Sequence, residues 1–350
     1  MISNLDKKKF NKVWQRILSS DRILLVSHIN PDVDAISSLG VLIEVLKTYN
    51  KKYIAFAEKK GDDYHYLPNF EDVISDKDEL LGRVGDEFNG GIKAKEDFLK
   101  YFDLVIIVDC GSIERTFISE NIHIAANLML ETFIVEIDHH LPVKTYANIE
   151  IKTQLSSATE LLYYFLKENK LEINRNMANC ILAGILTDTG NFLYSSVNEK
   201  TLEISSEMMS LGAQFPKLLN STWRNKNFLE MKIWGTALNN LKINKKYNIA
   251  FSVLSYEDLN LFRNISQDLS SDIFGDIVAF MSSLSEANVV LLLREEEPGK
   301  IKGSLRVGSS DKDIDVACLA SYFGGGGHKK AAGFMVEGKI VKENNRFKIQ

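Results

Sequence analysis

The chain has 350 residues, of which 45% are hydrophobic and 25% are charged, and its formal net charge at pH 7 is −5. This length fits two ordinary domains, and this composition excludes a disordered chain. Proteins that hold long nucleic acids through many phosphates are usually basic, so we expect any nucleic-acid substrate to be short. No apolar run reaches the ~18 residues that cross a bilayer, and no signal peptide is recognisable, so we expect a cytoplasmic protein without a membrane partner.

Short apolar runs in the first half of the chain predict buried strands at residues 23–27, 104–109 and 133–138, with a weaker candidate at 53–57. Helical patterns lie between or after them, at residues 36–47, 158–169 and 175–187. Strands that alternate with helices favour a mostly parallel sheet with helices on both faces. Residues 82–91 look like a surface excursion, and we assign them no role.

The pattern changes after a helical stretch at residues 198–241. Strands are predicted at 248–254, 288–294 and 302–307, and helices at 273–284 and 314–322. We therefore predict an α/β protein with three parts. These are an N-terminal domain (1–200) with the parallel sheet, a helical linker (201–245) and a smaller C-terminal α/β domain (246–350).

The segment from Ser27 to Ala35 directly follows the first predicted strand. Asp32 and Asp34 alternate with Val33, so on an extended segment both carboxylates would point the same way. His28 can fold back toward them through the Asn30-Pro31 turn, and one imidazole with two carboxylates suits a divalent metal ion. The alternative is a helix start with Asp34 as its N-cap, and this motif alone does not decide between the two.

Three further acidic elements follow along the chain. Asp109 ends the second predicted strand, Asp138-His139-His140 follows the third, and Asp188 lies in a Thr-Asp-Thr-Gly segment. Alone, each aspartate has a structural explanation as a turn or cap residue. Ligand sites in open α/β sheets form beyond the carboxyl ends of strands, where three of the four elements lie. Aspartates brought together there repel one another without cations, so the set predicts two divalent metal ions.

A glycine-rich segment, Gly324-Gly325-Gly326-Gly327-His328, follows the last predicted helix. Four glycines let backbone N–H groups approach an anion closely, and the alternative is a flexible hairpin. Arg306 lies on a predicted strand beside small residues, where a guanidinium can bind a phosphate through two hydrogen bonds. The alternative for Arg306 is an ordinary surface arginine.

Taken in order, these motifs resemble those of the DHH phosphoesterase family, which is named after its Asp-His-His triplet. The C-terminal part resembles the DHHA1 domain that follows it in the same family, so the resemblance covers nearly the whole chain. One departure is Val33, which stands where a small residue is common. The resemblance implies two domains that face each other over a cleft, with the metals in the first and the far end of the substrate in the second.

The resemblance also implies a role for each matching residue. One metal would be held by His28, Asp32 and Asp109, and the other by Asp34, Asp109, His139 and Asp188, with Asp109 bridging. His140 would lie near the substrate phosphate, so Asp109 and His140 are the residues that we expect to act in catalysis. Asp138 would orient a ligand histidine. The nucleotide would be bound by His140, Arg306, Gly325, Gly326, Gly327 and His328. The family generally prefers Mn²⁺, and the sequence leaves Mg²⁺, Fe²⁺ and Co²⁺ open.

Among stand-alone members of this size, the chain resembles the nanoRNase and 3′-phosphoadenosine 5′-phosphate phosphatase group. We therefore expect a metal-dependent hydrolase that acts on short oligoribonucleotides, on 3′-phosphoadenosine 5′-phosphate, or on both. The alternatives are a linear or cyclic dinucleotide phosphodiesterase and, from a different class, a non-catalytic nucleotide-binding sensor. We expect short RNA or a small nucleotide as the partner and no long nucleic acid, and we leave open whether the chain forms a homodimer.

Overall fold

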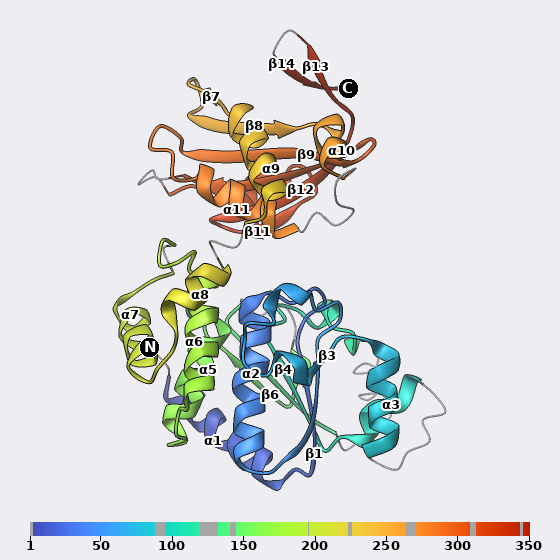
Figure 1. The fold of residues 1–350 in the computed structure, drawn as a ribbon, viewed down its shortest axis with the longest axis vertical. Helices are drawn as coiled ribbons and strands as arrows, with labels where there is room; N and C mark the ends of the chain where they lie inside the picture. The colour runs from blue at the N-terminus through green and yellow to red at the C-terminus, as the bar shows by residue number, and fades with distance from the viewer. Residues whose placement is uncertain are drawn as a thin grey trace. The chain divides into compact units, whose positions relative to one another are not determined.

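The structure is a computed structural model that describes residues 3–87, 95–119, 132–140, 145–194, 196–222, 226–263, 271–308, 313–343 and 346–350. The chain divides into two compact units, Met1–Asn225 and Lys226–Gln350 (Figure 1). None of the helices in the described ranges is long and apolar enough to cross a membrane.

The first unit is built on a parallel six-stranded sheet with the order β3-β2-β1-β4-β5-β6. Its strands are β1 (Arg22–Val26), β2 (Lys52–Phe56), β3 (Val73–Ile74), β4 (Leu104–Val108), β5 (Phe133–Asp138) and β6 (Ile149–Lys152). The four strands that the sequence predicts are confirmed to within one residue. The short β3 and the half-polar β6 were not predicted, because neither forms an apolar run. The predicted parallel α/β fold is confirmed.

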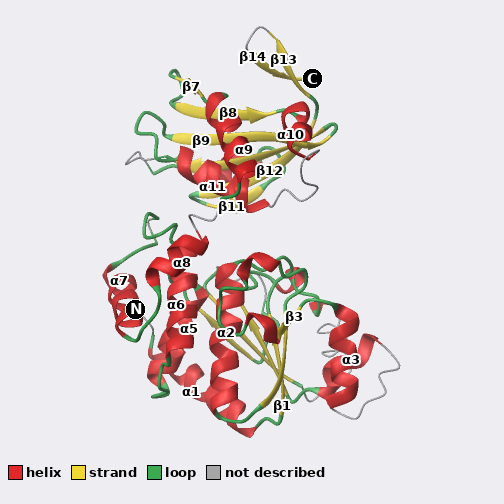
Figure 2. Cartoon of the chain, viewed as in Figure 1, coloured by secondary structure: helices red, strands yellow, loops and turns green. Residues whose placement is uncertain are grey.

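Helices cover both faces of this sheet, as the red helices on either side of the yellow strands show (Figure 2). One face packs against α1 (Asn4–Ser19), α2 (Val33–Thr48), α5 (Ala158–Glu168) and α6 (Arg175–Asp188). The other packs against α3 (Lys77–Glu87) and a 3-10 helix, η3 (Lys95–Tyr101). In β1, Leu25 belongs to the first core cluster and Leu24 to the second. Strands buried on both faces appear as continuous apolar runs, which is why the sequence revealed them.

Two N-terminal features differ from the sequence prediction. Helix α1 was not predicted because its lysines mask a buried stripe of Phe10, Val13, Trp14 and Ile17. These positions have the i, i+3, i+4, i+7 spacing of an amphipathic helix. Of the segment 82–91, residues 82–87 form the end of α3, and residues 88–91 lie outside the described residues.

The stretch that was predicted as a linker is shared between the two units. Helices α7 (Glu199–Ser210) and α8 (Phe215–Thr222) contribute Ile204, Met208 and Leu218 to the core of the first unit. Helix α9 (Phe228–Asn239) instead contributes Ile233 and Ala237 to the core of the second. The structure therefore divides the chain between residues 225 and 226, inside the predicted linker.

The second unit has a mixed six-stranded sheet with the order β11-β12-β10-β9-β8-β7. Only β8 and β9 pair in parallel. On one face lie α9, α10 (Tyr256–Arg263) and α11 (Ser271–Met281), and on the other lies α12 (Val316–Ser321). The strands are β7 (Lys242–Asn244), β8 (Ile249–Leu254), β9 (Val289–Glu297), β10 (Lys300–Val307), β11 (Gly326–His328) and β12 (Ala331–Glu337), and a separate hairpin contains β13 (Ile340–Glu343) and β14 (Arg346–Ile349).

Candidate metal centre

The predicted site residues of the first unit lie at one edge of its sheet. Strands β1, β4 and β5 are neighbours, and all three run in parallel. His28 follows β1, Asp109 follows β4, and Asp138 is the last residue of β5, directly before His139 and His140. Asp188, the last residue of α6, is the fourth element. The carboxyl ends of parallel strands meet at one edge, so residues far apart in sequence converge there.

His28, Asp32 and Asp109 form the first group, with one ligand atom of each within 4.8 Å of the others. His28 is buried, and its Nε2 atom lies 3.8 Å from Asp32 Oδ2. Asp32 is the N-cap of α2, since its Oδ1 accepts a 3.0 Å hydrogen bond from the Ala35 amide. The helix begins at Val33, so the expectation of an extended segment with Asp32 and Asp34 pointing the same way is wrong.

Asp34, His139 and Asp188 form the second group, again with ligand atoms within 4.8 Å. His139 Nε2 lies 3.2 Å from Asp188 Oδ2. Asp34 is fully buried in the first turn of α2, and its carboxylate accepts hydrogen bonds from the Ala158 amide (2.6 Å), the Thr159 amide (3.1 Å) and the Thr159 hydroxyl (2.8 Å). Asp32 and Asp34 thus belong to different groups.

The carboxylates of the second group carry strongly raised pKa values. Burial, with a further contribution from Asp109, raises the pKa of Asp34 to about 7. Burial and the charge of Asp34 raise the pKa of Asp188 well above its ordinary value. Several acids crowded into one buried place favour protonation unless a cation neutralises them. The raised pKa values of Asp34 and Asp188 therefore indicate that a bound cation would stabilise the charged carboxylates of this group.

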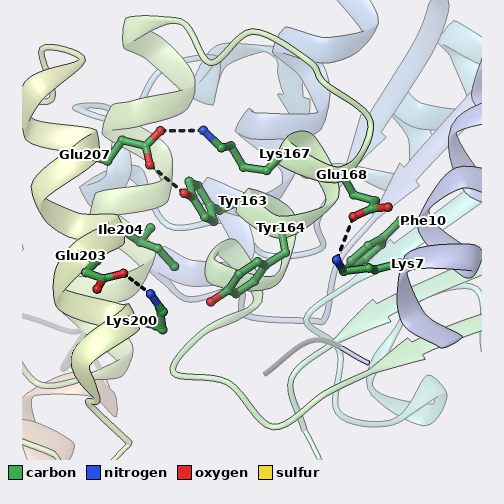
Figure 3. Close-up of a pocket in the computed structure, with 10 residues that line it drawn as sticks. All are labelled: Lys7, Phe10, Tyr163, Tyr164, Lys167, Glu168, Lys200, Glu203, Ile204 and Glu207. Atoms are coloured by element: carbon green, nitrogen blue, oxygen red, sulfur yellow. Dashed lines mark hydrogen bonds and ion pairs between the residues drawn. The ribbon is translucent and has the colours of Figure 1, made fainter. Parts of the chain in front are cut away.

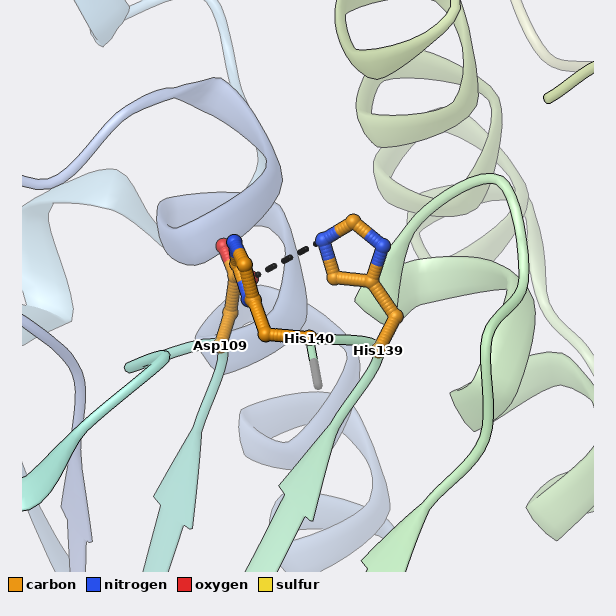
Figure 4. Close-up of side chains that lie close together, drawn as sticks. All are labelled: Asp109, His139 and His140. Atoms are coloured by element: carbon orange, nitrogen blue, oxygen red, sulfur yellow. Dashed lines mark ion pairs between the residues drawn. The ribbon is translucent and has the colours of Figure 1, made fainter. Parts of the chain in front are cut away.

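Asp109 of the first group and His139 of the second lie close together, with His140 beside them (Figure 4). His139 Nε2 lies 3.4 Å from Asp109 Oδ1. Both atoms are buried, and neither has a hydrogen-bond partner among the described residues. His139 Nδ1 lies 3.3 Å from the Leu155 carbonyl, which suits an Nδ1 proton and leaves Nε2 as a ligand atom. Buried oxygen and nitrogen atoms without partners are what a bound metal ion would satisfy, so these residues fit a divalent cation.

Asp138 orients His140 rather than a residue of either metal group. Its Oδ1 accepts from His140 Nδ1 at 2.7 Å and from the His140 amide at 3.0 Å, and its Oδ2 accepts from the Gly111 amide at 2.7 Å. Although burial opposes it, the hydrogen bond and charge of His140 lower the pKa of Asp138 to about 2. The His140 side chain is 36% exposed. The histidine that Asp138 orients is therefore His140, and whether this histidine is a metal ligand stays a prediction.

Of the predicted substrate residues of the second unit, all but Gly325 lie on the strands β10 and β11, and Gly325 directly precedes β11. Arg306 on β10 is half-buried and stands opposite Ala331 on β12, which in turn stands opposite His328 on β11. The Gly325 amide donates to the Ala320 carbonyl at 3.0 Å and so closes α12. A β-carbon on Gly325 would lie 2.2 Å from the Gly333 carbonyl oxygen, so close packing against β12 also requires glycine there.

The sequence did not reveal two residues that border the metal groups. Gly184 packs directly against Asp34, since a β-carbon at this position would lie 2.1 Å from Asp34 Oδ1. Arg115 lies beside His28, with 3.2 Å between Arg115 Nη2 and His28 Nδ1. No motif pointed to either, because both act through contacts with residues distant in sequence.

A surface hollow of about 480 Å³ lies elsewhere on the first unit (Figure 3). Its three lysines each pair with a carboxylate, at 3.6 Å for Lys7–Glu168 and 3.1 Å for Lys167–Glu207, with Lys200 paired to Glu203. None of its lining residues belongs to the metal groups. Because its charges are already paired, we assign it no role.

Comparisons with known families match both units. Residues 22–185 match the family model described as the DHH family, N-terminal domain, and residues 246–348 match the model of the DHHA1 domain. The two matches together cover well over half of the chain, so the protein belongs to the DHH/DHHA1 family of phosphoesterases. The resemblance that the sequence motifs carry is thereby confirmed.

The chain is also similar to individual members along most of its length. It is 27% identical to the bifunctional oligoribonuclease and PAP phosphatase NrnA of Bacillus subtilis, over 89% of this chain and 88% of that protein. It is 26% identical to the probable enzyme of the same name from Streptococcus mutans, over 93% and 92%. Among solved structures, an exopolyphosphatase-related protein from Bacteroides fragilis matches with a TM-score of 0.79 and 26% identity, over 94% of this chain and 91% of that chain.

Proposed function

We propose that the protein is a phosphoesterase that hydrolyses short oligoribonucleotides and 3′-phosphoadenosine 5′-phosphate with the help of two divalent metal ions. The observation that carries the proposal is the convergence of six metal-ligand candidates at one sheet edge, in two groups joined through Asp109 and His139. The relatives named oligoribonuclease and PAP phosphatase support the substrate class.

In this proposal one ion is held by His28, Asp32 and Asp109, and the other by Asp34, Asp109, His139 and Asp188. This set contains only carboxylates and imidazoles, which suits Mn²⁺ better than the soft metals that thiolates select. Bound divalent ions would supply Lewis acidity at the phosphoryl oxygens and lower the pKa of a nucleophilic water.

His140 is proposed to contact the phosphoryl group. Its Nδ1 atom is occupied by Asp138, so Nε2 is the ring atom that can donate to a phosphoryl oxygen. Although burial opposes it, the hydrogen bond and charge of Asp138 raise the pKa of His140 and favour the protonated, donating form. Asp138 thereby stabilises an imidazolium that offsets charge on the substrate.

The second unit is proposed to bind the nucleotide through Arg306, Gly325, Gly326, Gly327 and His328. Support comes from the register of three strands, which puts only Ala331 between Arg306 and His328. In this register no large side chain separates the positions of Arg306 and His328. The Gly325 amide already donates to Ala320, and the Gly333 carbonyl fills the space of its missing side chain, so Gly325 is proposed to shape the loop. A β-carbon on Gly326 would meet no atom within 4 Å, so the close approach that glycine permits is available to a ligand at Gly326.

The test is kcat/KM with Mn²⁺ as a function of substrate length and salt concentration. Long-strand enzymes follow the backbone through a basic groove, which this acidic chain does not suggest, so we expect the maximum at about two to five nucleotides. The panel includes 3′-phosphoadenosine 5′-phosphate and linear and cyclic dinucleotides. A shallow salt dependence is expected, because few phosphates would be neutralised.

Three outcomes would contradict the proposal, and each favours a different alternative. A rise in kcat/KM with length and a steep salt dependence would indicate a processive nuclease. Activity confined to dinucleotides would indicate a dinucleotide phosphodiesterase. Tight nucleotide binding without any hydrolysis in the presence of Mn²⁺, Mg²⁺, Fe²⁺ or Co²⁺ would indicate a sensor.

A further inference from the structure

Arg115 is a cationic side chain at the metal centre that no motif assigned. It is the last residue of a 3-10 helix, η4 (Ile113–Arg115), and its side chain is exposed. Its Nη2 atom lies 3.2 Å from His28 Nδ1, and its Nη1 atom donates to the Cys110 carbonyl at 3.3 Å. A β-carbon on Gly111 would lie 3.2 Å from Arg115 Nη1 and 3.7 Å from Cγ of His140. Arg115 and His140 therefore border the same small space.

The surroundings of His28 leave the Arg115 guanidinium with a free donor when a metal is bound. His28 Nδ1 lies 3.0 Å from the Ile29 carbonyl, which requires a proton on Nδ1, and 3.2 Å from Arg115 Nη2, which requires a lone pair there. The nitrogen cannot satisfy both contacts. A histidine that ligates a metal through Nε2 carries its proton on Nδ1 and donates it to a carbonyl. In that state Arg115 Nη2 has no acceptor on His28.

The backbone holds Arg115 in this place. The Ile29 amide donates to the Arg115 carbonyl at 2.8 Å, and the Arg115 amide donates to the Ser112 carbonyl at 3.1 Å. Within the described ranges, no carboxylate lies close enough to Arg115 to form an ion pair. The four aspartates of the two groups would offset the charge of two divalent ions, so the Arg115 guanidinium adds a further positive charge at the centre. This extra positive charge favours an anionic ligand.

We propose that Arg115 binds the phosphoryl group of the substrate, donating from its guanidinium to a non-bridging oxygen. The inference rests on the proposed phosphoesterase function and adds a phosphate-binding residue within the first unit. The planar guanidinium matches a phosphate through two parallel hydrogen bonds, whereas an ammonium acts as a point charge. Because the contact is to the phosphoryl group, it should serve oligonucleotides and 3′-phosphoadenosine 5′-phosphate alike.

The experiment compares Arg115→Ala and Arg115→Lys with wild type and with Arg83→Ala. Arg83 is an exposed arginine of α3 that pairs with Glu79, so its variant removes the same charge away from the site. With saturating Mn²⁺, Arg115→Ala should lower kcat/KM about 10- to 100-fold on both substrates, as expected for a lost charge-assisted hydrogen bond. Arg115→Lys should lie in between, and Arg83→Ala should match wild type.

Titration of the Mn²⁺-loaded proteins with inorganic phosphate gives a readout that needs no turnover. Arg115→Ala should weaken phosphate binding while its Mn²⁺ affinity stays at the wild-type value. Unchanged phosphate affinity in the variant, or no phosphate binding by the wild type, would overturn the inference. Weakened Mn²⁺ affinity with unchanged phosphate affinity would instead make Arg115 a positioning residue for His28. Failure of the wild type to hydrolyse any substrate would refute the proposed function, while the phosphate titration would still decide the role of Arg115.

Discussion

Gly184 is the position where a single added methyl group tests the second metal group. A β-carbon there would lie 2.1 Å from Asp34 Oδ1 and 2.3 Å from Thr159 Oγ1, both too close for any real contact. Gly184→Ala must therefore displace both side chains or move α6 away from α2 and α5. Asp34 has little room to move, because its carboxylate already accepts three hydrogen bonds.

The effect on stability follows from opposing contributions. Alanine is favoured over glycine within a helix by about 1 kcal/mol. Forcing a methyl group into a packed interior costs about 1–3 kcal/mol, and loss of one hydrogen bond to a charged group costs about 1.5–3 kcal/mol. We therefore expect Gly184→Ala to lower the free energy of unfolding by about 1.5–5 kcal/mol. Displacement of Asp34 should also weaken Mn²⁺ binding.

The matched control is Gly82→Ala in α3. It makes the same change within a helix of the same unit, where a β-carbon would meet no atom within 4 Å. This control should raise the free energy of unfolding by up to about 1 kcal/mol and leave metal binding unchanged. Urea denaturation gives the stabilities, and calorimetric titration gives the Mn²⁺ affinities. A Gly184→Ala protein with wild-type stability and wild-type Mn²⁺ affinity would refute both the packing of Asp34 and its role as a ligand.

Three other substitutions test separate parts of the structure. Asp109→Ala should abolish turnover and metal binding while circular dichroism stays unchanged, and a variant that keeps two metals and full activity would refute the assignment. Arg306→Ala should lower kcat/KM by a factor that corresponds to about 1.5–3 kcal/mol of transition-state binding, and it should leave the metal content unchanged. Wild-type kinetics would count against substrate binding by the second unit. Lys152→Met leaves buried Glu136, its partner at 2.8 Å, without a cation, which should destabilise the protein by about 3–5 kcal/mol at neutral pH. Burial raises the pKa of Glu136, so this loss of stability should shrink as the pH falls and the carboxyl becomes protonated. The control is Lys167→Met, which removes an exposed ion pair with Glu207 and should cost at most about 1 kcal/mol. Urea denaturation measures both variants.

The sequence by itself determined the class of fold and the edge of the sheet where the site lies. Strands such as β4 and β5 are buried on both faces and therefore appear as uninterrupted apolar runs. In a parallel sheet the residues after such strands share one edge, so Asp109 and the Asp138–His140 triplet could be placed together from their spacing alone. The ordered motifs were also specific enough to indicate the family.

Only the tertiary structure decided which atoms meet within that edge. Asp34 accepts hydrogen bonds from Thr159 on another helix, and Asp138 accepts a hydrogen bond from the His140 ring. Neither contact is encoded in a local pattern, because each depends on the packing of elements far apart in the chain. The same holds for Arg115, whose position beside His28 comes from the backbone hydrogen bond between Ile29 and Arg115. Periodicity and spacing describe one element at a time, whereas these contacts arise only when the elements pack together.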